Sequence, residues 1–340
     1  MAIRDDIARF CRQYLQLERH LDYPPATSLR DDQVQATLYE QLFADGAVAF
    51  PPSHRYQLGV LKELMAATEA SIDDWDQHGV SDDLMGSLSS LLSLPMPSEI
   101  TAAQQKSYVT YTLSLLDQVS SSAVQPAARI TLLEHRNLIS AFGTTGLRTW
   151  EAALHLGQYL CSHRSLIQGQ RVIELGAGTG YLSILCAKYL GASQVIASDG
   201  SDDVVANLPE NFYLNGLEGA TCISAMDIKW GHALVGTEEQ YWNGAKPIDV
   251  VLGADVTYDK TVIPALIGTM EELVGMFPEV KVLLAATERN RETFESFLGV
   301  CYQRQFRVDE VDFRLPAKKE QSGPFYSDDV PIRICTIHKS

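Results

Sequence analysis

The chain has 340 residues, of which 46% are hydrophobic and 21% charged, and these proportions are typical of a folded globular protein. Lys and Arg number 27 against 43 Asp and Glu, so the formal net charge is −16. This negative surplus repels phosphate backbones and anionic lipids, so we expect no direct binding to nucleic acid or to a membrane. It suits a cationic ligand or a basic partner surface instead.

Cysteine usage and the lack of long apolar stretches point to a cytoplasmic protein. The six cysteines lie too far apart for a C-x-x-C pair, so we expect reduced, mostly buried thiols and no disulfide or zinc framework. No signal-like region follows Met1, and no apolar run approaches the ~18 residues that span a bilayer. The histidines show no paired spacing near a carboxylate, so no metal site is expected.

The first third of the chain predicts helices joined by Pro-rich loops. Apolar residues recur at intervals of three and four from Ile3 to Leu21, which predicts one helix that ends before Pro24. Further helices are expected over residues 31–46, from a cap at Ser53 onward, and over residues 84–94.

A domain boundary is predicted near residue 125. Residues 108–119 are expected to be helical or partly extended, and the run Ser120–Ser122, followed by Pro126, has the composition of a connecting segment. The sequence therefore predicts an N-terminal, mainly helical domain over residues 1–125 and a second domain over residues 126–340. A chain of this length fits about two domains.

In the second domain short apolar strands alternate with helices. The expected strands are 130–133, 138–141, 171–175, 194–198, 221–225, 248–254, 280–286, 306–311 and 332–337, and the expected helices are 149–160, 181–190, 204–214, 263–275 and 292–300. This alternation predicts an α/β fold with a parallel sheet covered on both faces. The last two strands have no helix between them, so they are expected to pair antiparallel at an edge.

A glycine-rich turn follows the strand over residues 171–175. It reads G-x-G-x-G and consists of Gly176, Ala177, Gly178, Thr179 and Gly180. Glycines permit a tight turn and a close approach of the backbone to a ligand, here at the sheet edge where open α/β folds bind ligands. A dinucleotide site would require G-x-G-x-x-G. Glu174 just before the turn would disfavour an anion and favour a cation such as a sulfonium.

Acidic residues also end the next two strands. Asp199 can accept both hydroxyls of an adenosine ribose, although a helix N-cap is an alternative. Asp227 can accept an adenine amino group while Trp230 or Ile228 covers the ring. For these residues a turn-forming Asp and a core Trp are the alternatives.

The spacing of these strand ends resembles the seven-stranded class I methyltransferases that use S-adenosylmethionine. The resemblance implies a Rossmann-like sheet of seven strands with an antiparallel terminal strand. It also implies that the glycine-rich loop faces the methionine portion of the cofactor, Asp199 the ribose and Asp227 the adenine. The product would be S-adenosylhomocysteine.

A narrower resemblance rests on three segments. Asp255-Val-Thr-Tyr258, after the fourth strand, resembles the acidic-x-x-Tyr motif of the family-16 protein-lysine methyltransferases. Residues 143–154 resemble the segment before the cofactor loop in the elongation factor 2 lysine methyltransferase family, where the residue matching Trp150 contacts the cofactor. Pro51-Pro52-Ser53-x-x-Tyr56 is similar to that family's extra helical domain, which implies a part for residues 1–125 in substrate recognition.

The resemblance implies methylation of a lysine of translation elongation factor 2, its protein partner, and we expect the enzyme to be a monomer. The residues expected to bind S-adenosylmethionine are Trp150, Glu174, Gly176, Ala177, Gly178, Gly180, Asp199, Asp227, Trp230 and Ala254. The residues expected to be catalytic are Asp255 and Tyr258.

Methyl transfer needs a neutral amine, whereas a free lysine titrates at about pH 10.4. We expect Asp255 and Tyr258 to accept the N–H groups of the lysine and to aim its lone pair, while the proton leaves to water as the apolar site closes. Asp255 would then orient the amine more than it deprotonates it. For Tyr258 the alternative is a buried phenol in the core.

Three other functions are compatible with parts of this pattern. The same chemistry could act on another protein lysine or on a small amine, and a noncatalytic adaptor could bind the cofactor or a partner. An NAD-dependent oxidoreductase fits least, because the glycine spacing differs and no Tyr-x-x-x-Lys follows Asp255.

Overall fold

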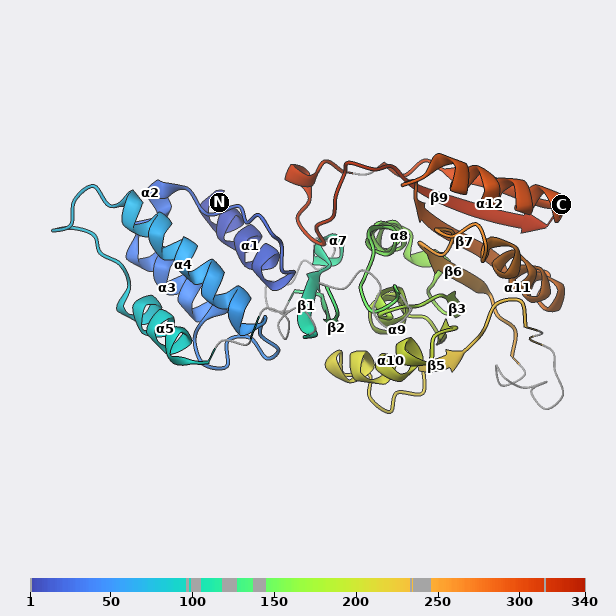
Figure 1. The fold of residues 1–340 in the computed structure, drawn as a ribbon, viewed down its shortest axis with the longest axis horizontal. Coiled ribbons are helices and arrows are strands. Elements are labelled where there is room, and N and C mark those ends of the chain that lie inside the picture. Colours follow the sequence, from blue (N-terminus) through green and yellow to red (C-terminus); the bar gives the residue numbers. More distant parts are fainter. Residues whose placement is uncertain are drawn as a thin grey trace. The chain divides into compact units, whose positions relative to one another are not determined.

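The computed structural model describes residues 2–95, 98, 105–117, 127–136, 145–232, 234, 246–314 and 316–339. The chain divides into two compact units (Figure 1). Unit 1 consists of Met1–Ser114, His135–Leu138 and Ser322–Phe325, and unit 2 consists of Leu115–Glu134, Ile139–Gln321 and Tyr326–Ser340. The Ser120–Ser122 and Pro126 segment and the strand expected over 138–141 lie outside the described residues.

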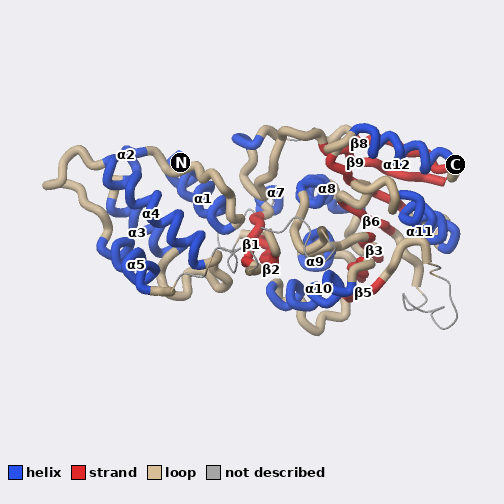
Figure 2. Tube along the Cα trace, in the orientation of Figure 1, coloured by secondary structure: helices blue, strands red, loops and turns tan. Residues whose placement is uncertain are grey.

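Unit 1 is built mainly of helices (Figure 2). Its elements are α1 (Ala2–Leu15), α2 (Ala26–Leu29), α3 (Asp32–Leu42), α4 (His54–Ser71), α5 (Asp82–Ser93) and β1 (Ser107–Thr112), and α7 (Ser114–Asp117) follows. Their apolar faces form one core around Phe10, Tyr14, Leu38, Leu61 and Leu64, all fully buried. Burial of each such side chain contributes about 1.5–3 kcal/mol, so packing rather than helix propensity holds this unit together.

Helix α1 is shorter than its apolar periodicity predicted. It ends at Leu15, and Leu17 takes a left-handed backbone conformation with φ of 58°. The amide of Glu18 donates to the carbonyl of Gln13 at 3.0 Å, which closes the last turn in the manner of a Schellman motif. Leu21 nevertheless packs against the core, so the apolar pattern continues beyond the helix because the following loop covers the same surface.

The C-terminal end of α3 and the cap of α4 also differ from the sequence prediction. Asp31 caps α3, since its Oδ1 accepts from the amide of Gln33 at 2.8 Å. The helix ends at Leu42, before Gly46. Ser53 occupies the N-cap position of α4, but its hydroxyl makes no capping hydrogen bond.

Unit 2 is organised around a mixed sheet. Its strands are β3 (Arg171–Leu175), β4 (Gln194–Asp199), β5 (Ile223–Asp227), β6 (Val250–Ala254), β7 (Lys281–Thr287), β8 (Phe306–Val311) and β9 (Ile332–Lys339), and a further strand β2 (Arg129–Glu134) lies apart from this sheet. Within the described residues the sheet has seven strands in the order β5-β4-β3-β6-β7-β9-β8. Only β9 runs antiparallel to its neighbours, β7 and β8. The predicted seven-stranded sheet with its antiparallel terminal strand is confirmed.

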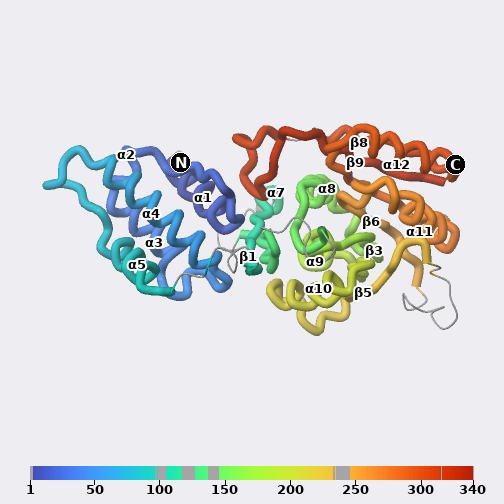
Figure 3. Tube along the Cα trace, viewed as in Figure 1, coloured from blue at the N-terminus to red at the C-terminus, as the bar shows by residue number. Residues whose placement is uncertain are grey.

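Helices cover both faces of this sheet. The helices of unit 2 are α8 (Glu151–Ser162), α9 (Tyr181–Lys188), α10 (Asp202–Leu214), α11 (Ile263–Met276) and α12 (Arg291–Gln303), with short 3-10 turns η1 (Arg164–Leu166) and η2 (Lys318–Glu320). Figure 3 shows α8, α9 and α10 on one face and α11 and α12 on the other. Strand residues such as Ile173, Val251 and Leu284 form a buried core with Leu266 of α11 and Phe297 of α12.

Part of the connection between β8 and β9 belongs to unit 1. Phe325 is only 1% exposed, and the side-chain amide of Gln16 bonds to both its backbone N–H and its carbonyl. The hydroxyl of Ser114 donates to the carbonyl of Gly323 at 2.6 Å. Unit 1 is therefore assembled from segments that lie far apart in the sequence.

All six cysteines are free, and all except Cys222 are buried, which confirms the prediction of unpaired, mostly buried thiols. Among the described parts of the chain, no helix combines the length and apolarity needed to cross a membrane.

Candidate active site

A cleft of about 380 Å³ lies at the carboxyl ends of β3, β4 and β6, within unit 2. Of the residues predicted for the site, those that line the cleft are Trp150, Glu174, Gly176, Ala177, Gly178, Asp199, Trp230, Ala254, Asp255 and Tyr258. Gly180 and Asp227 do not line it. Residues from five separate parts of the chain thus meet at one sheet edge, where α/β folds bind ligands.

The glycine-rich loop needs its glycines for conformation and for space. Gly176, Gly178 and Gly180 all have positive φ, at 68°, 54° and 81°, a region that other residues rarely adopt. A Cβ on Gly178 would lie 3.0 Å from the carbonyl oxygen of Gly146. Gly180 precedes α9, and a Cβ there would lie 2.8 Å from Leu208, so this glycine serves helix packing rather than the cleft wall.

We expect Gly178→Ala to weaken S-adenosylhomocysteine binding at least about tenfold, because the loop must shift away from Gly146. Isothermal titration calorimetry measures the effect. Gly169→Ala is a matched control: φ is also positive, 74°, but a Cβ would meet nothing within 4 Å and the residue does not line the cleft. Equal affinities for the two variants would contradict the prediction.

Asp199 ties the glycine-rich loop to the end of β4. Its Oδ2 accepts from the amide of Gly178 at 3.1 Å, and its Oδ1 accepts from the amide of Ser201 at 3.0 Å. Burial raises the pKa of this carboxyl, and the amide hydrogen bonds oppose that rise. The N-cap of α10 is Ser201, so the alternative of Asp199 as that cap is wrong. Its remaining lone pairs can accept hydroxyl groups of a ligand in the cleft.

Of the two residues predicted to hold the adenine, Trp230 lines the cleft and Asp227 does not. Asp227 pairs in register with Asp199 across β4 and β5, but it is half-exposed and bound to the ammonium of Lys229 at 2.9 Å. Lys229 rather than Asp227 lines the cleft. Trp230 lies against the loop, since a Cβ on Gly176 would come within 3.2 Å of its ring. Its indole N–H is buried and has no hydrogen-bond partner among the described residues.

Glu174 does not present its charge to the cleft in the way its sequence position suggested. The side chain is 2% exposed, and its Oε2 accepts from both the amide and the hydroxyl of Ser183 in α9. Burial raises the pKa of Glu174 to about 8. At pH 7 the carboxyl is therefore mostly neutral, and its visible role is to fasten β3 to the first turn of α9.

Because the carboxyl of Glu174 is buried, we expect the stability of the folded protein to depend on pH. The pKa of Glu174 is about 8 in the folded chain and about 4.3 for an exposed Glu, so folding takes up a proton between these values. The contribution of protonated Glu174 to the free energy of unfolding is complete below about pH 4.3 and is lost as the pH rises through 8. From pH 6.5 to 9 we expect the melting temperature of the native protein to fall more steeply than that of Glu174→Gln. Parallel curves in thermal unfolding would refute this.

Asp255 is held in a defined orientation at the end of β6. It has a φ of 52°, a strained value for a residue other than glycine, and its side chain is 7% exposed. Oδ1 accepts from the amide of Thr287 at 2.8 Å, and Oδ2 accepts from the hydroxyl of Thr287 at 3.0 Å. The guanidinium of Arg289 lies 3.4 Å from Oδ2. The carboxylate is thus anchored by neighbours on β7 and just beyond it.

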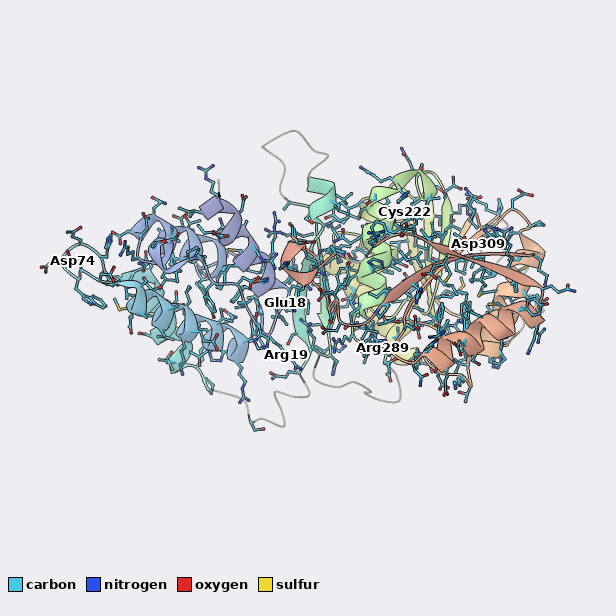
Figure 4. The ribbon with its side chains drawn as sticks, turned by 90° about the horizontal axis from the view of Figure 1, so that it is seen from above. Glu18, Arg19, Asp74, Cys222, Arg289 and Asp309 are labelled. Carbon is cyan, nitrogen blue, oxygen red and sulfur yellow. The ribbon has the colours of Figure 1, made fainter. Side chains whose placement is uncertain are left out.

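Trp150 and Tyr258 complete the rim of the cleft. The indole N–H of Trp150 donates to the carbonyl of Thr145 at 3.0 Å, and the guanidinium groups of Arg148 and Arg289 each lie 4.9 Å from the centre of its ring. Arg289 is labelled in Figure 4. Tyr258 is 58% exposed, so the alternative of a buried phenol is wrong.

Several residues of the site escaped sequence reasoning. The hydroxyl of Thr149 donates to the fully buried Glu134 of β2 at 2.6 Å and lies 2.7 Å from the hydroxyl of Thr179 in the glycine-rich loop. Thr179 had a signal, its place within the loop motif. Glu134 and Arg289 had none, because they are distant in sequence from the motif and only the fold brings them against the cleft residues Thr149 and Asp255.

The fold and the cleft together define a class I methyltransferase. A family profile described as lysine methyltransferase matches residues 137–303. The protein-lysine N-methyltransferase EFM3 of Chaetomium thermophilum is 56% identical over 98% of this chain and 97% of its own length. EFM3 of Saccharomyces cerevisiae is 36% identical over 62% of this chain and 66% of its own, and human protein-lysine N-methyltransferase EEF2KMT is 29% identical over 74% and 71%. The chain belongs to this family of S-adenosylmethionine-dependent protein-lysine N-methyltransferases.

The residues of the cleft fit this cofactor. A volume of about 380 Å³ lies within the range of small-molecule sites, ~300–1,000 Å³. The carboxylate of Asp199 can accept the ribose hydroxyls, and the indole N–H of Trp230, which has no partner in the described part of the chain, can donate to a ligand acceptor. The glycines leave backbone rather than side chains against the ligand.

Proposed function

We propose that this protein methylates a lysine of translation elongation factor 2. The main supporting observation is that Asp255 and Tyr258 line the same cleft as the glycine-rich loop and Asp199. The target comes from the resemblance of residues 143–154 and 51–56 to the elongation factor 2 lysine methyltransferases. Residues 143 and 144 of the first segment lie outside the described residues.

Within the cleft the cofactor is proposed to lie along the sheet edge. Its methionine portion would face the glycine-rich loop beside Trp150, and its ribose would face Asp199. The adenine would lie near Trp230, with Asp227 acting through its ion pair with Lys229, which lines the cleft. Ala254 would line the site next to Asp255.

The chain's own residues then prepare the amine. When bound, S-adenosylmethionine supplies a methyl carbon that forms a bond to the lysine Nζ as its bond to sulfur breaks, with one lysine proton already released to water. Both oxygens of Asp255 are anchored by Thr287, so the carboxylate suits orienting an N–H group better than carrying a proton away. The exposed phenol of Tyr258 provides a second acceptor for the amine. Positioning of this kind can contribute ~7–11 kcal/mol to a barrier reduction.

The proposed setting is a cytoplasmic monomer that recognises its protein substrate through the N-terminal helical domain. The net charge of −16 favours a basic docking surface on the target. No direct contact with nucleic acid or a membrane is part of the proposal.

The test is transfer of a radiolabelled methyl group to purified elongation factor 2, followed by mass spectrometry of the labelled lysine. Whole cytosol serves as a parallel substrate, and calorimetry with S-adenosylhomocysteine and with NAD reports cofactor choice. A labelled elongation factor 2 band supports the proposal. Label on a different protein or on a small amine would show that elongation factor 2 is not the substrate. Binding of NAD without S-adenosylhomocysteine would overturn the proposal of methyl transfer.

A further inference from the structure

One guanidinium, that of Arg289, connects the charged groups beside Asp255. It follows β7 and forms an ion pair with Glu151, the first residue of α8. Its Nη2 also lies 3.4 Å from Oδ2 of Asp255, and its planar group lies over the ring of Trp150. Asp255, which follows β6, and Trp150 and Glu151, at the start of α8, therefore share this side chain.

Its surroundings differ from those of an ordinary surface ion pair. Exposed pairs contribute little because water screens them and two long side chains must be ordered. Here the side chain of Arg289 is 41% exposed, but those of its partners Asp255 and Glu151 are only 7% and 22% exposed, so water screens the carboxylates less than in an exposed pair. Stacking on an aromatic face further restricts the guanidinium.

Among the described residues, Arg289 is the one cation within ion-pair distance of Asp255. The hydrogen bonds from Thr287 orient the carboxylate, but they leave its charge in place. A lone carboxylate beside the substrate amine would stabilise the ammonium form, which cannot accept a methyl group. A neighbouring guanidinium offsets that attraction and favours release of the proton.

We propose that Arg289 is a positioning residue that balances the charge of Asp255, so that the substrate lysine is held by its N–H groups yet reaches the neutral form. This inference rests on the proposed lysine methylation at Asp255. Trp150 keeps its bond to Thr145 and its contact with Arg148 when Arg289 is changed, so cofactor binding is expected to remain.

Other charged or titratable groups lie around Asp255 and Arg289, and they are unchanged in the Arg289 variants. They are Arg148 before α8, Glu151 in α8 and Tyr258 after β6.

The experiment compares Arg289→Gln, Arg289→Lys and the control Arg291→Gln, whose side chain is 81% exposed and pairs with Glu295 in α12. We expect Arg289→Gln to move the rising limb of the kcat–pH profile up by about one unit, which is about a tenfold loss of kcat at pH 7.5 that disappears at high pH. The KM for elongation factor 2 should stay constant or fall. Arg289→Lys, which keeps the charge, and Arg291→Gln should follow the native profile.

An unmoved profile in Arg289→Gln, or an equal loss at every pH, overturns the inference. If the native protein does not label elongation factor 2, the proposed function fails, and a second measurement still tests Arg289. Hydrogen exchange of the Thr287 amide, which donates to Asp255, should be faster in Arg289→Gln than in Arg289→Lys. Equal exchange in the two variants counts against an anchoring contact. Calorimetry with S-adenosylhomocysteine confirms that each variant is folded.

Discussion

Asp255→Asn is expected to lower kcat for lysine methylation by about 100-fold or more, the scale on which one preorganised polar group acts. The amide presents an NH2 group where the carboxylate now accepts from the hydroxyl of Thr287 and contacts Arg289. It also removes the negative charge that is proposed to face the substrate ammonium during docking. Asn tolerates a positive φ, so the backbone at 52° is preserved.

Turnover with labelled S-adenosylmethionine measures the loss of kcat, and thermal unfolding shows whether the variant keeps its fold. Asp259→Asn is the matched control in the same loop, because Asp259 accepts from Thr261 and does not line the cleft. We expect the control to keep its turnover within about twofold and Asp255→Asn to keep its fold. Normal methylation by Asp255→Asn would remove Asp255 from the proposed machinery.

Deleting residues 1–125 is expected to destabilise what remains as well as to abolish turnover on elongation factor 2. The deletion removes Gln16 and Ser114, while their partners in the segment Ser322–Phe325 stay in the fragment. Exposure of Phe325 costs about 1.5–3 kcal/mol. Each of its two backbone groups that loses a partner costs up to about 1–3 kcal/mol unless water replaces it.

Thermal unfolding and solubility of residues 126–340, compared with the full chain, check this expectation. Gln16→Ala in the full chain tests the same contact without a truncation and should lower the free energy of unfolding by about 1–3 kcal/mol. Gln41→Ala, an exposed position in α3, is the control and should change it by less than about 0.5 kcal/mol. A fragment with native melting and native turnover would contradict the prediction.

Apart from the strand expected over 138–141, which lies outside the described residues, the predicted strands and helices of unit 2 are present because their signals are local. Val172 and Ile173 lie in a short apolar run that becomes the buried strand β3, and the glycines after it predict the turn. The end of α1 was less predictable. Leu17 and Leu21 continue the apolar spacing although the chain has left the helix, because a loop can cover the same core surface.

The site shows the same division between local and distant signals. Asp199, Trp230 and Tyr258 were expected in a common site and line one cleft. The charge state of Glu174 could not be read from its position in the motif, since it depends on burial beneath α9 and on hydrogen bonds from Ser183. Asp227 ends its strand as expected, but it forms a salt bridge with Lys229 and does not line the cleft.

The sequence by itself determined the succession of strands and helices along the chain, the glycine-rich turn and the acidic strand ends, since periodicity and backbone freedom are properties of neighbouring residues. Only the tertiary structure decided that Thr287 and Arg289 anchor Asp255 and that Ser322–Phe325 joins unit 1. These contacts link residues far apart in the chain. Their energies depend on distance, burial and direction in space, and no spacing along the sequence records those quantities.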